Sequence, residues 1–149
     1  MPQFLDYNRD FLNLHHTLTC GQAFRWKLND DGWWTAPVKS KVIRIKEADS
    51  GFLWETLPGE PDIELFHSYF RLDTDVPSIY EHLARSDKHV AELIRCFRGL
   101  RLLRQDPEET LITYLCSPVN FISRISQSIE RISCSPWDTS SNTTPQSSS

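Results

Sequence analysis

The spacing of apolar residues changes near residue 57, from a period of two to a helical period. Before this point apolar and polar residues alternate in short runs, such as Val42-Ile43-Arg44-Ile45-Lys46, which is typical of a strand with one buried face. Such runs predict four strands, at residues 24–28, 33–36, 41–46 and 52–55. Tight turn signals such as Asn29-Asp30-Asp31-Gly32 separate the strands, so we expect an antiparallel meander.

Three helices with recognisable ends are predicted after the strands. The first covers residues 62–70, where Ile63, Phe66 and Phe70 lie at helical spacing. A second begins after Asp73-Thr74-Asp75, and a third begins at Asp87 and ends at Gly99. A sheet followed by helices indicates an α+β fold.

Two further helices are predicted after residue 105. Asp106 caps the first, Pro107 has the φ angle of a first helical residue, and Pro118 ends it. Its apolar residues share one stripe, which predicts a buried helix: Leu111, Ile112, Leu115 and Cys116. Asn120 caps the second helix, in which isoleucines recur at helical spacing and Arg124 belongs to a basic outer face.

Charge and length restrict the class of protein. A net charge of −4 over 149 residues argues weakly against nucleic acid as a partner, because proteins that bind DNA usually carry a basic excess. The segment from Arg95 to Arg131 differs, with six arginines against four acidic residues and hence a net charge of +2. No apolar run reaches the ~20 residues of a membrane-spanning helix, and the first residues do not resemble a signal peptide. We therefore expect no membrane partner and an intracellular protein, nuclear in a eukaryote and in the cytoplasm or nucleoid in a prokaryote.

The cysteines predict free thiols and no metal site. None of them belongs to a Cys-x-x-Cys pair or lies near a histidine at ligand spacing: Cys20, Cys96, Cys116 and Cys134. We accordingly expect no metal and no cofactor. Residues 139–149 contain no apolar side chain except Pro145, too little to offset the entropy cost of ordering them. The segment 134–149 is therefore predicted to be a disordered tail.

Three segments resemble the N-terminal half of the 8-oxoguanine DNA glycosylases. They are Leu-Thr-Cys-Gly-Gln-Ala-Phe-Arg-Trp at 18–26, Tyr-Phe-Arg-Leu-Asp at 69–73 and, above all, Gly-Leu-Arg-Leu-Leu-Arg-Gln-Asp-Pro at 99–107. The resemblance implies a twisted antiparallel sheet with helices, like a TATA-binding-protein repeat, leading into a helical domain with a helix-hairpin-helix motif. It divides the chain into an α+β domain at 1–105, the first helix pair of the helical domain at 106–133, and the tail.

The resemblance also implies base-excision DNA repair, with double-stranded DNA containing an oxidised purine as the partner. In this family an Asn-Asn-Asn-Ile-x-Arg segment fills the gap left by the extruded nucleotide and holds the orphaned base. Its arginine corresponds to Arg124 and its middle asparagine to Asn120. The outer asparagines are replaced by Val119 and Phe121, which wedge between bases but cannot hydrogen-bond a cytosine edge. Specificity for another damaged purine is therefore an open alternative.

On the lesion side, Gly21 corresponds to the family glycine whose carbonyl recognises the extra N–H of 8-oxoguanine, and Phe24 to an aromatic near that pocket. Taken without the resemblance, Gly21 is a turn residue, Phe24 a core residue and Arg124 a solvated helix residue. The arginines before residue 105 line DNA phosphates or are solvated or salt-bridged: Arg95, Arg98, Arg101 and Arg104.

The family's catalytic lysine and aspartate lie beyond the region of resemblance. No lysine of this chain matches the catalytic one: Lys27, Lys39, Lys41, Lys46 and Lys88. We assign no catalytic residue, and two hypotheses stay open. The chain is part of a glycosylase and apurinic-site lyase, or it is a non-catalytic module that binds DNA or a protein. If later helices are missing, the stripe Ile122, Ile125, Ile129 and Ile132 should be exposed.

Overall fold

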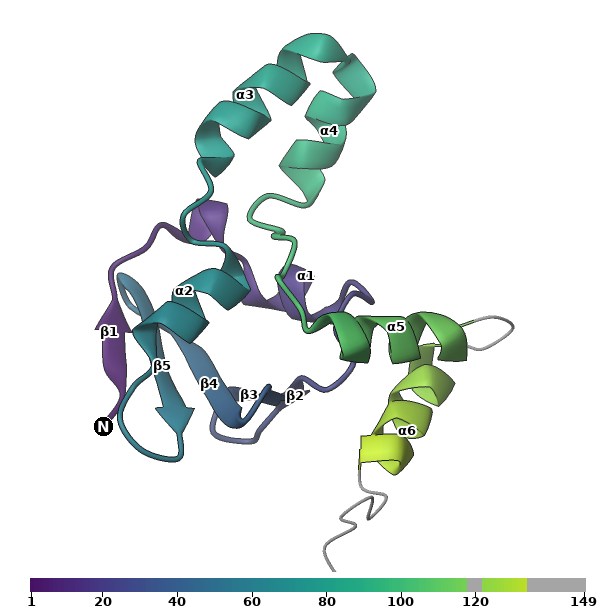
Figure 1. The fold of residues 1–149 in the computed structure, drawn as a ribbon. Coiled ribbons are helices and arrows are strands. Elements are labelled where there is room, and N and C mark those ends of the chain that lie inside the picture. Colours follow the sequence, from purple (N-terminus) through teal and green to yellow (C-terminus); the bar gives the residue numbers. More distant parts are fainter. Residues whose placement is uncertain (118–121, 134–149) are drawn as a thin grey trace, which may run out of the picture.

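A five-stranded antiparallel sheet forms one layer of the fold, with the strand order β1-β5-β4-β3-β2 (Figure 1). The strands are β1 (Gln3–Leu5), β2 (Lys27–Leu28), β3 (Trp34–Val38), β4 (Lys41–Ala48) and β5 (Gly51–Leu57). Strands β2 to β5 form the expected meander, and β1 pairs with β5 at one edge. This computed structural model describes residues 1–117 and 122–133. The predicted α+β fold is confirmed.

Helices pack on one face of the sheet and extend beyond it. They are the 3-10 helix η1 (Arg9–Phe11), α1 (Leu14–Thr19), α2 (Ile63–Phe70), α3 (Val76–Ser86), α4 (Lys88–Cys96), α5 (Pro107–Cys116) and α6 (Ile122–Ser133). In Figure 1, α1 and α2 lie against the sheet, and α3 and α4 form a hairpin that projects from it. Helices α5 and α6 lie near β2. In the described part of the chain, no helix combines the length and apolar character needed to cross a membrane.

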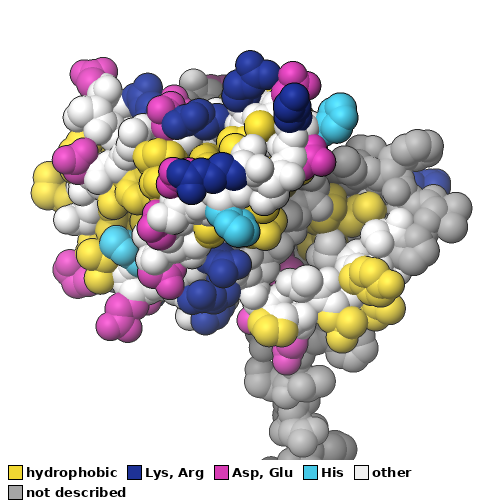
Figure 2. Space-filling model, turned by 90° about the horizontal axis from the view of Figure 1, so that it is seen from above, with side chains coloured by type: hydrophobic (Ala, Val, Ile, Leu, Met, Phe, Trp, Pro, Cys, Tyr) yellow, Lys and Arg dark blue, Asp and Glu magenta, His cyan; other side chains and the backbone are white. Residues whose placement is uncertain are grey.

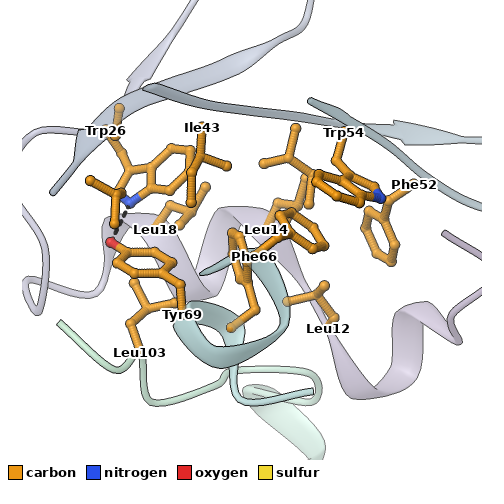
Figure 3. Close-up of a cluster of buried hydrophobic side chains, with 14 residues drawn as sticks. Leu12, Leu14, Leu18, Trp26, Ile43, Phe52, Trp54, Phe66, Tyr69 and Leu103 are labelled. Carbon is orange, nitrogen blue, oxygen red and sulfur yellow. Dashed lines mark hydrogen bonds between the residues drawn. The ribbon is translucent and has the colours of Figure 1, made fainter. Parts of the chain in front are cut away.

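The hydrophobic core lies between the sheet and helices α1 and α2 (Figure 3). Ile43 of β4 and Phe66 of α2 are fully buried. The rings of Trp54 and Phe66 stack with their centroids 4.1 Å apart and an interplanar angle of 14°. Leu103, in the extended segment before α5, closes the same cluster. The core therefore joins residues from the N-terminal helix, the sheet and a segment near residue 100.

The register of β4 shows why its residues alternate between apolar and charged. Ile43 and Ile45 are fully buried in the core, whereas Arg44 lies on the opposite face, 2.6 Å from the Glu55 carboxylate of β5. The guanidinium of Arg44 and the ammonium of Lys46 lie 4.7 Å and 5.2 Å from the centroid of the Trp33 ring. The outer face of the sheet is thus covered by long charged side chains over an aromatic ring.

Tyr69 links the sheet region to α2 through a buried hydrogen bond. The indole Nε1–H of Trp26 donates to the Tyr69 hydroxyl at 3.0 Å, as drawn in Figure 3. Burial disfavours the phenolate and raises the pKa of Tyr69 from 10.0 to about 12, although the bond from Trp26 acts in the opposite direction. The folded state therefore keeps this hydroxyl neutral at a pH where an exposed tyrosine ionises.

This difference in pKa predicts a pH-dependent loss of stability. Between about pH 10 and 12 the unfolded state releases the tyrosine proton while the folded state retains it, so the free energy of unfolding falls as the pH rises. The slope from this residue is at most roughly 1.4 kcal/mol per pH unit. Urea unfolding at several pH values should show a shallower decline for Tyr69→Phe than for the natural chain. Parallel declines would contradict the prediction.

The strands differ from the sequence prediction at their ends. Strand β1 was missed because its three residues, Gln-Phe-Leu, are too few for a periodic pattern. Strand β3 continues through Pro37 and Val38, which were predicted to lie in a loop. Proline is tolerated there because β2 pairs only with Thr35 and Trp34, so that β3 is an edge strand at Pro37.

The helix starts agree closely with the prediction. The side chains of Asp62, Asp75 and Asp87 each accept a hydrogen bond from a backbone N–H in the first turn of α2, α3 and α4 respectively. Asp106 does the same for α5, and Pro107 is its first residue. Four aspartate caps thus set the starts of four helices.

The prediction that α5 is buried is wrong. Leu111, Tyr114 and Leu115 are 58%, 70% and 66% exposed, and hydrophobic side chains are visible on this helix at the right of Figure 2, beside the grey residues. The less exposed residues of α5 include Glu109 and Thr113, one helical turn apart. The helix therefore turns a polar side toward the described part of the chain, and its apolar stripe faces away.

Helix α6 is packed on one side. Ile125 and Ile129 are 5% and 3% exposed, whereas Ile132 is 44% exposed. The expectation of an exposed isoleucine stripe is therefore wrong for the first two of these residues. The predicted disordered tail, 134–149, lies outside the described residues, and the domain boundary at residue 105 stays a prediction.

Candidate nucleic-acid interface

The loop between α1 and β2 presents an unused backbone acceptor at Gly21. This residue has a φ of 86°, in the left-handed region that glycine adopts without a Cβ clash. Among residues 1–117 and 122–133, no hydrogen bond is accepted by the Gly21 carbonyl. Gly21 is half-buried, and its carbonyl oxygen is unpaired within the described chain. Phe24, three residues later, is also half-buried and is not a member of the core cluster.

Gln22 joins this loop to the extended segment before α5. Its Nε2 donates to the carbonyls of Thr17 at 2.9 Å and of Arg101 at 2.7 Å, while its Oε1 accepts from the Leu103 N–H at 2.9 Å. The backbone carbonyl of Gln22 accepts a hydrogen bond from Gln105 Nε2. The segments 18–26 and 99–107, which carried the sequence resemblance, are therefore held together directly.

Arg101 is a buried cation that pairs with backbone oxygens. Arg101 is only 3% exposed, and all five N–H groups of its guanidinium have acceptors. Nε donates to the Phe70 carbonyl at 2.9 Å, Nη1 to the Tyr7 hydroxyl at 2.7 Å and the Phe11 carbonyl at 3.0 Å, and Nη2 to the carbonyls of Arg71 and Thr74. Two of these carbonyls belong to the C-terminal end of α2, where a positive charge is favoured.

Gly99 lets the chain pass close to the N-terminal helix. Its φ is 82°, and a Cβ atom placed on it would lie 2.7 Å from the Asn13 nitrogen. Its carbonyl accepts the Asn13 N–H at 2.8 Å, and its own N–H donates to the Tyr80 hydroxyl at 3.0 Å. Thr17 strengthens the contact, because its hydroxyl accepts the Arg101 N–H at 3.1 Å. The segment from Gly99 to Gln105 is therefore fixed along its length.

Two ion pairs hold the α5–α6 pair beside the same loop. Arg25 lies 3.6 Å from the Glu109 carboxylate of α5, and Lys27 pairs with Glu130 of α6. Figure 1 shows both helices next to β2 and the loop that precedes it. Both pairs are at least partly exposed, so each contributes little stability, but together they orient the helices.

Arg124 is exposed on α6 and has no acidic partner within residues 1–117 and 122–133. It follows the short connection from α5, and Ile125 beside it points into the buried side of the helix. The structure gives no direct contact between Arg124 and Gly21 or Phe24. The other predicted DNA-contacting residues, Val119, Asn120 and Phe121, lie outside the described residues.

The arginines before residue 105 divide into different roles. Arg95 and Arg98 form ion pairs with Glu92 at 3.3 Å and Asp10 at 3.5 Å, as one of the two interpretations expected. Arg104 donates to the Ser68 hydroxyl at 3.2 Å. Both interpretations are wrong for Arg101, which is buried and makes no ion pair with the described residues. Gln22 was not predicted as a site residue, although it belongs to the segment 18–26.

The described residues show no group of three or more histidine, cysteine, aspartate or glutamate side chains arranged to hold a metal ion. Cys20 and Cys96 are free thiols, and Cys134 lies outside the described part. Charges of both signs are mixed over the α3–α4 hairpin, which faces the viewer in Figure 2, so that hairpin forms no uniformly basic surface.

Most of the chain is similar in sequence to known proteins. Residues 4–111 match the model of the family described as "8-oxoguanine DNA glycosylase, N-terminal domain". Two similar proteins are the N-glycosylase/DNA lyase of Saccharomyces cerevisiae, 33% identical over 138 residues, and that of Arabidopsis thaliana, 28% identical over 128 residues. The alignments cover 83% and 82% of this chain but only 36% and 35% of those proteins. The chain thus spans about a third of the length of these relatives.

Solved structures share the fold. A structure described as MBOgg1 in complex with a low-affinity DNA ligand superposes with a TM-score of 0.77 and 28% identity, covering 91% of this chain and 49% of that one. The 8-oxoguanine glycosylase/lyase of Clostridium acetobutylicum, in complex with double-stranded DNA containing cytosine opposite 8-oxoguanine, superposes with a TM-score of 0.72 and 25% identity. The match covers 85% of this chain and 45% of the Clostridium chain.

Proposed function

We propose, from the premise that the chain belongs to the 8-oxoguanine DNA glycosylase N-terminal domain family, that it binds double-stranded DNA containing an oxidised purine. In this proposal it forms the lesion-contacting part of a base-excision repair protein. The observation that carries the proposal is the unpaired Gly21 carbonyl on a loop fixed to the segment that leads into α5. A similar fold in the Clostridium structure holds a duplex with 8-oxoguanine, which supports the same partner here.

Gly21 is proposed to discriminate the oxidised base. 8-Oxoguanine carries an N–H where guanine carries an acceptor, so a carbonyl facing that edge gains a hydrogen bond only with the lesion. An unpaired or opposed polar atom in a closed pocket costs ~1–3 kcal/mol, which is enough for selection among bases. Extrusion of the base costs a further few kcal/mol, and less for a damaged pair. Phe24 is proposed to line the same pocket.

Arg124 is proposed to contact the duplex from the other side. It is a solvent-exposed cation with no acidic partner in the described part of the chain, so no ion pair with these residues has to break before it binds DNA. Asn120, Val119 and Phe121 precede it and are proposed to occupy the gap left by the extruded base. The ion pair between Lys27 and Glu130 would keep α6 in place during this contact.

Replacing Arg124 with alanine should weaken binding to a duplex with an 8-oxoguanine–cytosine pair about 10-fold or more. A charge-assisted hydrogen bond contributes about 1.5–3 kcal/mol, and each 1.4 kcal/mol is a factor of ten in affinity. Fluorescence anisotropy titration at fixed salt measures the change. Arg85→Ala is the control, because Arg85 is also an exposed arginine and lies on α3. Equal affinity of Arg124→Ala and the natural chain would reject the role of Arg124.

Glycosylase and lyase activity is proposed only for the longer protein to which such a domain belongs. The alternative is a non-catalytic binding module. Borohydride trapping on an 8-oxoguanine duplex separates the two, because a lyase forms a Schiff base that borohydride reduces to a covalent adduct. An adduct supports the enzyme, whereas retention of the duplex without an adduct supports the module.

A further inference from the structure

The side chain of Gln22 is almost saturated with hydrogen bonds. Both N–H groups of its amide have backbone acceptors, on Thr17 and Arg101, and its oxygen accepts the Leu103 N–H. From this geometry we infer that Gln22 is a positioning residue, which fixes the direction of the Gly21 carbonyl and thereby sets discrimination between 8-oxoguanine and guanine. The inference rests on the proposed function.

The peptide group that carries the Gly21 carbonyl ends at the nitrogen of Gln22. Gly21 itself has no side chain to restrict its backbone, and its φ of 86° belongs to a region that glycine enters and leaves easily. Rotation of this peptide is therefore limited mainly from the Gln22 side. There, the side chain and the backbone carbonyl of Gln22 are both bonded, the latter to Gln105.

The Gly21 carbonyl takes no part in the hydrogen bonds that Gln22 makes with the described residues around it. The carbonyls of Thr17, Gln22 and Arg101 all accept hydrogen bonds, whereas that of Gly21 accepts none within the described chain. A network that served packing alone would be expected to satisfy this half-buried acceptor as well. An acceptor held rigid and left unpaired is suited to bind a donor on a ligand, because little conformational entropy is lost on binding.

The partners of Gln22 also connect the loop to the helix pair. Arg101, Leu103 and Gln105 all belong to the extended segment that ends at the start of α5. Gln22 therefore fixes the position of the Gly21 loop relative to the base of α5. Arg25, three residues after Gln22, also pairs with Glu109 of α5.

Gln22→Met tests the inference, because methionine has a similar length and no N–H or carbonyl group. The natural chain should prefer an 8-oxoguanine–cytosine duplex over a guanine–cytosine duplex, by roughly 5- to 150-fold in Kd. In Gln22→Met we expect this ratio to fall to within about two-fold of one, while Kd for the undamaged duplex changes by less than about three-fold, since phosphate contacts dominate that affinity. Gln22→Glu should lose discrimination similarly, because it keeps the acceptor but removes the donor.

Three controls separate positioning from a general loss of structure. Gln3→Met makes the same chemical change at an exposed position on β1 and should keep the natural ratio. Near-ultraviolet circular dichroism reports whether each variant retains its packed core. In ¹H–¹⁵N spectra the Gly21 amide signal should shift or broaden in Gln22→Met, and the signals of the β4 residues should not.

Each outcome decides between the proposals. A folded Gln22→Met that keeps the natural ratio overturns the role of Gln22 and leaves the proposed function standing. A natural chain that does not distinguish the two duplexes overturns the proposed function and this inference with it. If Gln22→Met does not fold, Gln22→Glu decides, because it keeps the acceptor for the Leu103 N–H and removes both donors. A lowered ratio in that variant supports the inference, and an unchanged ratio overturns it.

Discussion

Replacing Arg101 with methionine should lower the free energy of unfolding by about 3–5 kcal/mol. Methionine fills a similar volume but donates nothing, so four carbonyls and one hydroxyl would lose a charged donor in a buried site. The lost hydrogen bonds join the segment at residue 101 to the N-terminal segment and to the end of α2. For a domain whose total stability is ~5–15 kcal/mol, a change of this size removes a large part of it.

Urea denaturation followed by tryptophan fluorescence measures this loss. Arg98→Met is the control, because Arg98 is an arginine three residues away whose ion pair with Asp10 is exposed, and such pairs contribute ~0–1 kcal/mol. Arg101→Lys should fall between the natural chain and Arg101→Met, since an ammonium supplies a charge but only three donors. If Arg101→Met cost no more than Arg98→Met, the hydrogen bonds of Arg101 would not stabilise the fold.

Replacing Gly99 with alanine should cost about 3 kcal/mol or more of folding stability. The φ of 82° is unfavourable for alanine, at roughly 1–2 kcal/mol, and the added Cβ would meet the Asn13 nitrogen at 2.7 Å and the Arg9 carbonyl oxygen at 2.9 Å. Both obstacles are backbone atoms, so relief requires movement of the chain, which costs a further 1–3 kcal/mol or so. Displacement here also weakens the bond between Gly99 and Asn13.

Gly32→Ala separates the two causes. Gly32 has nearly the same φ, 80°, but no atom lies within 4 Å of the position its Cβ would take. This control therefore carries the backbone penalty without the collision, and we expect it to cost about 1–2 kcal/mol. The difference between the two variants, measured by thermal unfolding, gives the cost of the collision. Equal losses would mean that the segment at Gly99 moves away from Asn13 freely.

The helix starts and the sheet were predictable because their causes are local. An aspartate before a helix needs only the N–H groups of the next turn, and Asp75, Asp87 and Asp106 all act in this way. The alternation of apolar and charged residues around Ile43 and Ile45 likewise results from burial of one face of the strand. Such patterns require no knowledge of which distant residues approach.

The roles of buried polar residues were not predictable in the same way. Nothing near Arg101 in sequence indicates that Tyr7, Phe11 and Phe70 will supply its acceptors. For α5, an apolar stripe indicates burial only if a partner covers it, and the described chain supplies none for Leu111 and Leu115. Sequence pattern gives the face of a helix but not the orientation of that helix in the fold.

The candidate site was named from a resemblance rather than from physical reasoning on the sequence. Gly21 and Arg124 were identified through neighbouring motif residues, and their roles stay predictions. The structure added the features that make Gly21 a suitable recognition group: its carbonyl is unpaired within the described chain, and Gln22 beside it is held at several points. Neither feature can be recognised from the amino-acid sequence.

The bonds between the two motif segments also bear on how the chain folds. They join residues 79 to 83 positions apart, among them Gln22 with Arg101 and Gln22 with Gln105. Contacts so distant along the chain raise the contact order and slow the search for the native topology. During synthesis the N-terminal sheet residues would emerge long before the segment that locks them together. Until residue 105 has left the ribosome, the nascent chain can hold the meander but cannot complete its core.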